Sequence, residues 1–275
     1  MQELNDLIGF WNTYKPTKDE HSIHQDDKDF VEKFKDRIYF DKITCYKKEM
    51  EKLLETQNSE TLFHANIPPG PYLGDLRGSK LFFLLINPGF GFMSYYEAEN
   101  KDIRKEIFNT VYQQNLNEDY PFFLLNPEYL WTSGGQYWHK KFHRLIKEIS
   151  AKKDKSYLET LKMFAQNIAT IELIPYPSKN IGHIKKGMIE SLASTQKTLS
   201  FVHSLLNQKD ILVVVMRQAG NWKLDKIIDC EVRAKLLKFG AKQSQSASLN
   251  PEKSVGLEVE NEILRMIDKG IINFK

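Results

Sequence analysis

Three short, largely apolar segments constrain the fold of this 275-residue chain more than any other feature. Each has the length of a strand and is bounded by polar or turn residues: KLFFLLIN (80–87), NIATIELIP (167–175) and DILVVVMR (210–217). A strand without alternating polar residues is buried on both faces, which is typical of a parallel sheet that is covered by helices. The segments therefore predict a parallel α/β arrangement.

Helical patterns long enough for crossover connections separate these segments. They cover residues 103–114, 137–150 and 188–208, and an amphipathic segment (259–273) is expected to end the domain as a helix with Gly270 near its C-cap. A fourth, more polar strand is expected near residues 241–248. The predicted fold class is α/β: a three-layer α/β/α sandwich with a central, mainly parallel four-stranded sheet.

The first 65 residues are predicted to form a helical extension packed on a main domain of residues 66–275, because segments 30–38 and 46–57 show apolar residues at helical spacing. Charge is divided unevenly along the chain. Residues 1–60 carry 10 basic and 14 acidic side chains, a net charge of −4, whereas the remainder carries 29 and 22, a net charge of +7. The positive part is compatible with a polyanionic partner.

Composition excludes several classes of protein. No apolar run approaches the roughly 20 residues that cross a bilayer, and the N-terminus lacks the pattern of a secretory signal. Cys45 and Cys230 have no metal-site spacing, and no acidic third ligand follows His139 and His143. We therefore expect a cytoplasmic monomer without membrane contact, metal or cofactor.

The loop after the first apolar segment is the first candidate for chemistry, because ligands of open parallel sheets bind beyond the carboxyl ends of the strands. Its sequence from Asn87 to Phe92, NPGFGF, lacks the glycine patterns of dinucleotide and triphosphate sites. It offers instead a polar side chain at a strand end, a rigid turn, two glycines and aromatic rings. The structural alternative is a tight turn into a helix with Asn87 as the helix cap.

The segment INPGFGFM (86–93) resembles the first active-site motif of the uracil-DNA glycosylase superfamily, in its single-strand-selective and mismatch-specific branches. The resemblance implies that Asn87 positions the attacking water and that Phe90 or Phe92 stacks on a flipped base. Gly89 and Gly91 would then line the base-binding loop, with backbone N–H groups available to the leaving base.

Two further motifs follow in the order of that superfamily. IELIPYPS (171–178) places Glu172 where the family has a base-reading Asn, and Tyr176 is expected in the same base-binding loop. SLNPEKSVG (248–256) resembles the second motif, and Asn250 matches its leading His or Asn. The resemblance covers roughly residues 66–257, and PPGPYLGD (68–75) is also similar to little-characterised bacterial members.

Membership would imply a monofunctional DNA glycosylase that flips out a base and hydrolyses its N-glycosidic bond, with Asn87, Glu172 and Asn250 as catalytic residues. Glu172 departs from the family pattern. An ionised carboxylate only accepts hydrogen bonds, so it suits the N4 amino group of cytosine and not the O4 of uracil. We expect a modified cytosine as substrate, for instance in phage DNA. The alternative function is that of a uracil repair enzyme. The alternative role of Glu172 is structural, as a hydrogen bond or a salt bridge with a nearby Lys.

DNA is the expected partner. The residues assigned to DNA contact follow the second and third apolar segments and the second motif: Lys179, Lys185, Lys186, Arg217, Trp222, Lys253 and Ser254. Several aromatic residues are candidates for the pocket wall, together with a flexible turn at residues 133–135: Tyr95, Tyr96, Tyr120, Phe122, Phe123, Tyr129 and Trp131. The basic run at 139–155 and Trp222 have structural alternatives, as a solvated helix face and a core residue. A noncatalytic nucleic-acid-binding module and an unrelated hydrolase or transferase remain open as rival functions.

Overall fold

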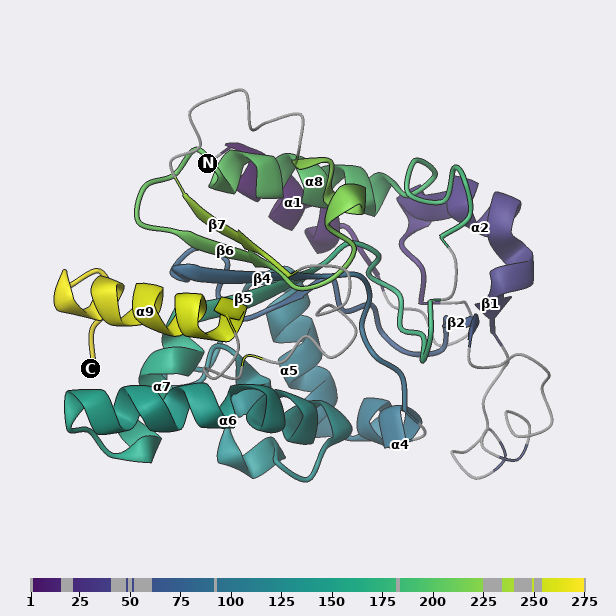
Figure 1. The fold of residues 1–275 in the computed structure, drawn as a ribbon. Coiled ribbons are helices and arrows are strands. Elements are labelled where there is room, and N and C mark those ends of the chain that lie inside the picture. The colour runs from purple at the N-terminus through teal and green to yellow at the C-terminus, as the bar shows by residue number, and fades with distance from the viewer. Residues whose placement is uncertain are drawn as a thin grey trace. The chain divides into compact units, whose positions relative to one another are not determined.

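A computed structural model describes residues 2–15, 22–40, 48, 51, 61–91, 93–181, 184–224, 234–239, 249 and 254–274 (Figure 1). The chain is an α/β protein that divides into two compact units. The first unit comprises Met1–Tyr72, Asn87–Gln114 and Glu172–Ser200, and the second comprises Leu73–Ile86, Asn115–Ile171 and Phe201–Lys275. The chain therefore passes between the units several times.

The main sheet belongs to the second unit, except for the end residues Tyr72 and Glu172. Among the described residues it has five strands, in the order β3-β5-β4-β6-β7. Their bounds are β3 (Tyr72–Leu73), β4 (Leu81–Leu85), β5 (Ile168–Glu172), β6 (Leu212–Val215) and β7 (Lys235–Lys238). β6 pairs in parallel with both β4 and β7, with Leu81 opposite Leu212 and Leu212 opposite Lys235. The three apolar segments thus form neighbouring central strands.

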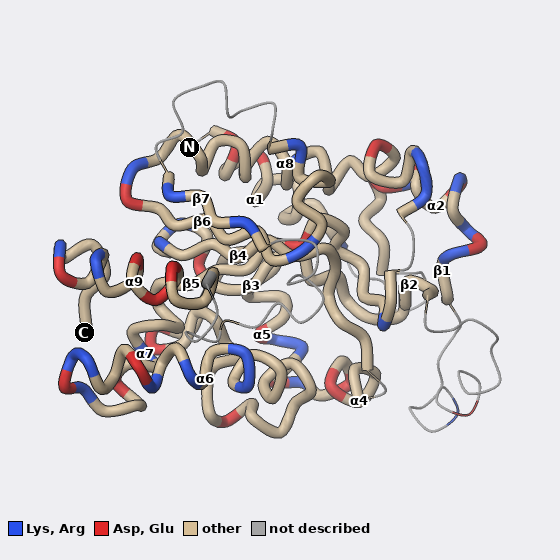
Figure 2. Tube along the Cα trace, viewed as in Figure 1, with Lys and Arg blue, Asp and Glu red and all other residues tan. Residues whose placement is uncertain are grey.

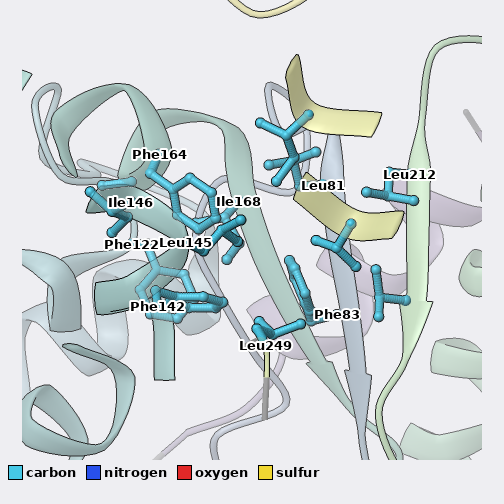
Figure 3. Packing of buried hydrophobic residues seen from close by; sticks show 14 of the residues in the cluster. Leu81, Phe83, Phe122, Phe142, Leu145, Ile146, Phe164, Ile168, Leu212 and Leu249 are labelled. Carbon is cyan, nitrogen blue, oxygen red and sulfur yellow. The ribbon is translucent and has the colours of Figure 1, made fainter. Parts of the chain in front are cut away.

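Side chains of β4 alternate between the two faces of the sheet, because successive strand residues point in opposite directions. Leu81 and Phe83 belong to a large buried cluster, in which the Phe83 ring meets Phe142 edge-on at 5.5 Å (Figure 3). Phe82 contacts Phe201 of helix α8 (Ala193–Leu205) at a centroid distance of 6.2 Å. Because both faces are buried, the strand sequence LFFLL is apolar throughout.

Helices α6, α7 and α9 of the second unit supply about half of the buried residues of this cluster (Figures 1 and 3). The helical elements of this unit are η4 (Phe123–Leu125), η5 (Pro127–Tyr129), α6 (Ser133–Lys153), α7 (Tyr157–Asn167), η6 (Ala219–Trp222) and α9 (Ser254–Asp268). A capping box of Ser156 and Glu159 starts α7. After α9, Gly270 has φ 67°, which agrees with its predicted place near the C-cap.

The segment at residues 133–135 is the first turn of α6, so the prediction of a flexible turn at these residues is wrong. The Thr132 hydroxyl caps this turn by accepting a hydrogen bond from the Gly135 backbone at 2.8 Å. A Cβ atom on Gly135 would lie 2.2 Å from the Tyr129 carbonyl oxygen. Close packing therefore leaves no room for a side chain at position 135, which explains the glycine there.

The first unit contains the N-terminal segment together with the loops that follow β4 and β5. Its elements are α1 (Gln2–Asn12), η1 (Gln25–Asp27), α2 (Lys28–Phe34), η2 (Lys35–Arg37), β1 (Ile38–Tyr39), β2 (Phe63–His64), α4 (Met93–Glu99), α5 (Lys101–Tyr112) and the start of α8. β1 and β2 pair in parallel as a separate two-stranded sheet, and α1 packs on α5. Residues 1–65 are therefore grouped with the motif loops in this division, and the expected boundary at residue 65 stays a prediction.

Two strands of the main sheet were not expected, since β3 has two residues and β7 is flanked by lysines, and the short strands β1 and β2 were not expected either. The expected strand at 241–248 and most of the expected helix at 46–57 lie outside the described residues. No helix in the described part of the chain combines the length and apolarity needed to span a membrane.

Candidate functional site

Three loop segments of the first unit are joined by backbone hydrogen bonds around the NPG motif. Ser178 donates to the Pro88 carbonyl at 3.1 Å, and Gly89 and Ser178 form an isolated parallel bridge. His64 donates to the Pro177 carbonyl at 2.8 Å. The loops after β4, after β5 and around β2 therefore form one assembly, which the order of motifs in the sequence does not reveal.

The side chain of Asn87 lies at the centre of this assembly. Its Nδ2 atom donates to the Pro88 carbonyl at 2.8 Å, to the Ser178 carbonyl at 3.2 Å and to the Ser178 hydroxyl at 3.1 Å. Two of these acceptors are carbonyl oxygens, which cannot donate, so only the nitrogen of the amide can face them. The contacts therefore fix the amide plane and direct Oδ1 away from Ser178.

Asn87 is not the cap of the following helix. Helix α4 begins six residues later, at Met93, and in its first turn the Ser94 hydroxyl accepts from the Gly91 backbone at 3.1 Å. The helix-cap alternative is thus wrong for Asn87. The same contact engages the Gly91 N–H, which was one of the expected donors to a leaving base.

The two glycines of the motif border open space. A Cβ atom built on Gly89 or Gly91 would meet no atom of the described chain within 4 Å, and neither residue has a positive φ. Neither internal packing nor backbone conformation therefore requires glycine at positions 89 and 91, whereas close packing requires glycine at position 135. Open space beside a glycine allows another molecule to approach the backbone closely.

Aromatic rings pack against one side of the loop that follows β4. The Phe90 ring stacks on His64 with a centroid distance of 3.6 Å and an interplanar angle of 10°. His64 is buried, and its Nδ1 lies 3.0 Å from the Tyr95 hydroxyl. Since His64 covers one face of the partly buried Phe90, that face cannot stack on a base.

Glu172 and Tyr176 are both buried, but in different surroundings. Glu172, the last residue of β5, is 7% exposed, and its backbone donates to the Pro71 carbonyl at 2.8 Å. Tyr176 is 1% exposed, its ring stacks with Phe30 at 5.8 Å and its hydroxyl donates to Asp27. Tyr176 thus belongs to the packed interior of the first unit, and its expected contact with a base is not supported by this position.

Asp27 connects the N-terminal segment to the loop after β5. Its carboxylate accepts hydrogen bonds from the Tyr176 hydroxyl at 2.5 Å, the Ser194 hydroxyl at 2.6 Å and the Ser194 backbone at 2.9 Å. Burial raises the pKa of Asp27 above its ordinary value of 3.8, although these hydrogen bonds oppose the shift. Burial and the neighbouring Asp27 raise the pKa of Tyr176 well above 10. The pair stabilises the loop that carries Ser178.

The residues assigned to DNA contact fall into two groups. Lys179, Lys185 and Lys186 are exposed in the first unit, where Lys185 pairs with Asp36 at 2.8 Å. In the second unit Arg217 is exposed, whereas Trp222 is fully buried and its carbonyl lies 3.1 Å from His203 Nε2. Trp222 is therefore a core residue and not a wedge.

Several expected site residues cannot be placed in the assembly. Phe92, Asn250 and Lys253 lie outside the described residues, and Ser254 begins α9. Of the aromatic residues expected in a pocket wall, Tyr95 contacts the loop through Phe90 and His64, whereas Tyr120, Phe122 and Phe123 are buried in the second unit. The structure adds His64, Ser178 and Asp27, for which no local sequence pattern gives a signal.

Within the described residues, no group of three His, Cys, Asp or Glu side chains could hold a metal ion. The chain matches no protein-family model, no curated protein and no solved structure. The loop assembly and the motifs in the sequence are therefore the features of this chain that bear on its function.

Proposed function

We propose that this chain is a monofunctional DNA glycosylase of the uracil-DNA glycosylase type, which hydrolyses the N-glycosidic bond of a flipped base and leaves an abasic site. The proposed fold is the corresponding α/β/α sandwich with a mainly parallel sheet. The observation that carries the proposal is the fixed amide of Asn87 in a loop that directly follows a buried strand.

In the proposed reaction, Asn87 Oδ1 accepts a hydrogen bond from a water molecule and orients its oxygen toward C1′ of the sugar. The C1′–N bond breaks and its electron pair leaves with the base, while the water oxygen bonds to C1′ and its released proton ends on the base. The amide is a weak base, so stabilisation of the departing base must supply much of the rate. We assign the Gly89 backbone N–H to that task, since the Gly91 N–H is engaged by Ser94.

A modified cytosine is the proposed substrate because of Glu172. Its carboxyl group is buried, and an ionised carboxylate only accepts hydrogen bonds, so a base that donates at this position is favoured over one that presents an acceptor. An N4 amino group meets this requirement and the O4 of uracil does not. We propose that the enzyme also requires a substituent at C5 of the base. This second requirement would spare the unmodified cytosine of the host and fits an antiviral role.

A noncatalytic nucleic-acid-binding module is the second candidate. The observation that favours it is the same set of Nδ2 contacts, because an Asn that joins two loops contributes to structure even when no reaction follows. Excision by the wild type that disappears in Asn87→Ala would exclude this alternative.

Abasic-site formation on a panel of oligonucleotides tests the proposal. The panel contains uracil, cytosine, hydroxymethylcytosine and glucosylated hydroxymethylcytosine, each in single-stranded and duplex form. We expect excision of a modified cytosine by the wild type, and a preference that shifts toward uracil in Glu172→Gln, because a neutral amide can donate to O4. Robust uracil excision by the wild type would overturn the substrate assignment, and no abasic product on any substrate would overturn the enzyme assignment.

A further inference from the structure

Exposed aromatic side chains gather at the N-terminal end of α6 in the second unit. Trp131 is 44% exposed directly before the Thr132 cap, and Tyr137 is 40% exposed in the first turns of the helix. The other three tryptophans of the chain, Trp11, Trp138 and Trp222, are all buried. Exposure of a tryptophan costs hydrophobic free energy, so this position calls for a reason other than folding.

Positive charge accompanies these rings. Lys141 places its Nζ 5.2 Å from the centre of the Tyr137 ring, one helical turn away. Partial burial, together with the positive charges of Arg217 and Lys140, lowers the pKa of Lys141 to about 8. Figure 2 shows the basic residues along α6. Cations crowded in this way are stabilised by an anion that binds among them.

The other end of the same helix carries basic residues whose ion-pair partners lie on α9. Lys152 pairs with Glu260 and Lys153 pairs with Asp268, so acidic residues of α9 and of its C-terminal turn compensate these charges. At this end of the helix the basic run therefore forms ion pairs with α9. In the N-terminal half, basic residues lie beside exposed rings.

We propose that Trp131, Tyr137, Lys141 and Arg217 form a binding surface for single-stranded DNA. Exposed rings stack on unpaired bases, whose faces are accessible only outside a duplex, while the cations contact phosphates. The choice of DNA over RNA rests on the proposed glycosylase function. The surface itself is a property of the second unit and does not require that the Asn87 loop be catalytic.

Fluorescence of Trp131 provides a direct measurement, because the other three tryptophans are buried. The experiment uses the full chain carrying Asn87→Ala, so that excision cannot alter the probe, and an oligothymidylate of roughly 16 nucleotides. We expect quenching of the long-wavelength emission on binding. Trp131→Ala and Lys141→Gln should each weaken binding about tenfold, measured by anisotropy of a labelled oligonucleotide.

Matched controls lie on α7 of the same unit. Leu158 is exposed like Trp131, and Lys162 pairs with Asp119, so Leu158→Ala and Lys162→Gln should leave affinity within twofold. Thermal unfolding of Trp131→Ala should match the parent protein, which separates lost binding from lost folding.

Four results would overturn the proposal: emission that does not respond to the oligonucleotide, unchanged affinity in Trp131→Ala, tighter binding of duplex DNA, or tighter binding of oligouridylate. Failure of excision by the wild type with intact Trp131 quenching would overturn the glycosylase assignment and not the binding surface.

Discussion

Asn87→Asp changes one atom of the candidate site and tests the orientation of its side chain. In the wild type, Nδ2 donates to two carbonyl oxygens, of Pro88 at 2.8 Å and of Ser178 at 3.2 Å. A carboxylate oxygen in that place has no proton to donate. The Ser178 hydroxyl can turn and donate to it, but both carbonyls lose a partner.

The expected cost follows from these two losses. A buried polar group without a partner costs about 1–3 kcal/mol, and because Asn87 is only partly buried we take the lower end for each carbonyl. Asn87→Asp should therefore lower the free energy of unfolding by about 2 kcal/mol when the new carboxyl group is ionised. Protonation restores one donor, so the pKa of this group should lie above the ordinary value of about 3.9 in the folded state. The stability difference should grow as pH rises through that folded pKa.

Urea unfolding of both proteins at pH 4 and pH 8 measures the effect. Asn100→Asp is the matched control, because Asn100 accepts hydrogen bonds from the backbones of Asp102 and Ile103 as the N-cap of α5, and Asp caps equally well. We expect no loss from this control. Equal stability of Asn87→Asp and wild type at pH 8 would refute the assigned orientation of the Asn87 amide.

Three further predictions concern the interior and the loop. Asp27→Ala should lower the free energy of unfolding by about 3–5 kcal/mol in urea titrations, because three buried donors lose their acceptor. The raised pKa of Asp27 makes its ionisation unfavourable for folding, so its contribution to stability falls as pH rises from 3.8 through the folded pKa, and Asp27→Asn should remove this part of the pH dependence. Gly89→Ala should change the melting temperature little while it lowers excision, whereas Gly135→Ala should melt markedly earlier because its Cβ collides with a backbone oxygen. Ser178→Ala removes one of three acceptors around Asn87 and should slow single-turnover excision by roughly fivefold, which corresponds to about 1 kcal/mol.

The central strands could be predicted because a run of apolar residues is stable only where both faces are buried. Segments 80–87, 167–175 and 210–217 therefore contain β4, β5 and β6. β7, KLLK, has one buried residue and polar ends, so its sequence carries no such pattern, and β3 is too short to show any periodicity. Both strands depend on pairing with neighbours and not on their own composition.

The candidate site was predictable only in part. The position of Asn87 after a buried strand follows from the sequence, but its hydrogen-bond partner Ser178 lies 91 residues away. The sequence predicts a base-binding role for Tyr176, whereas its burial against Asp27 depends on an N-terminal segment whose docking leaves no local pattern. Contacts between residues far apart in the chain are set by tertiary packing.

The rate of abasic-site formation in single-turnover reactions, with wild type, Asn87→Ala and Asn100→Ala, tests the central claim most directly. DNA that contains a modified cytosine is the substrate. We predict that Asn87→Ala slows excision by about 100-fold or more, as expected when a catalytic water loses its orienting group, while Asn100→Ala, which removes only a helix cap, retains the wild-type rate. Equal rates for wild type and Asn87→Ala would contradict the account.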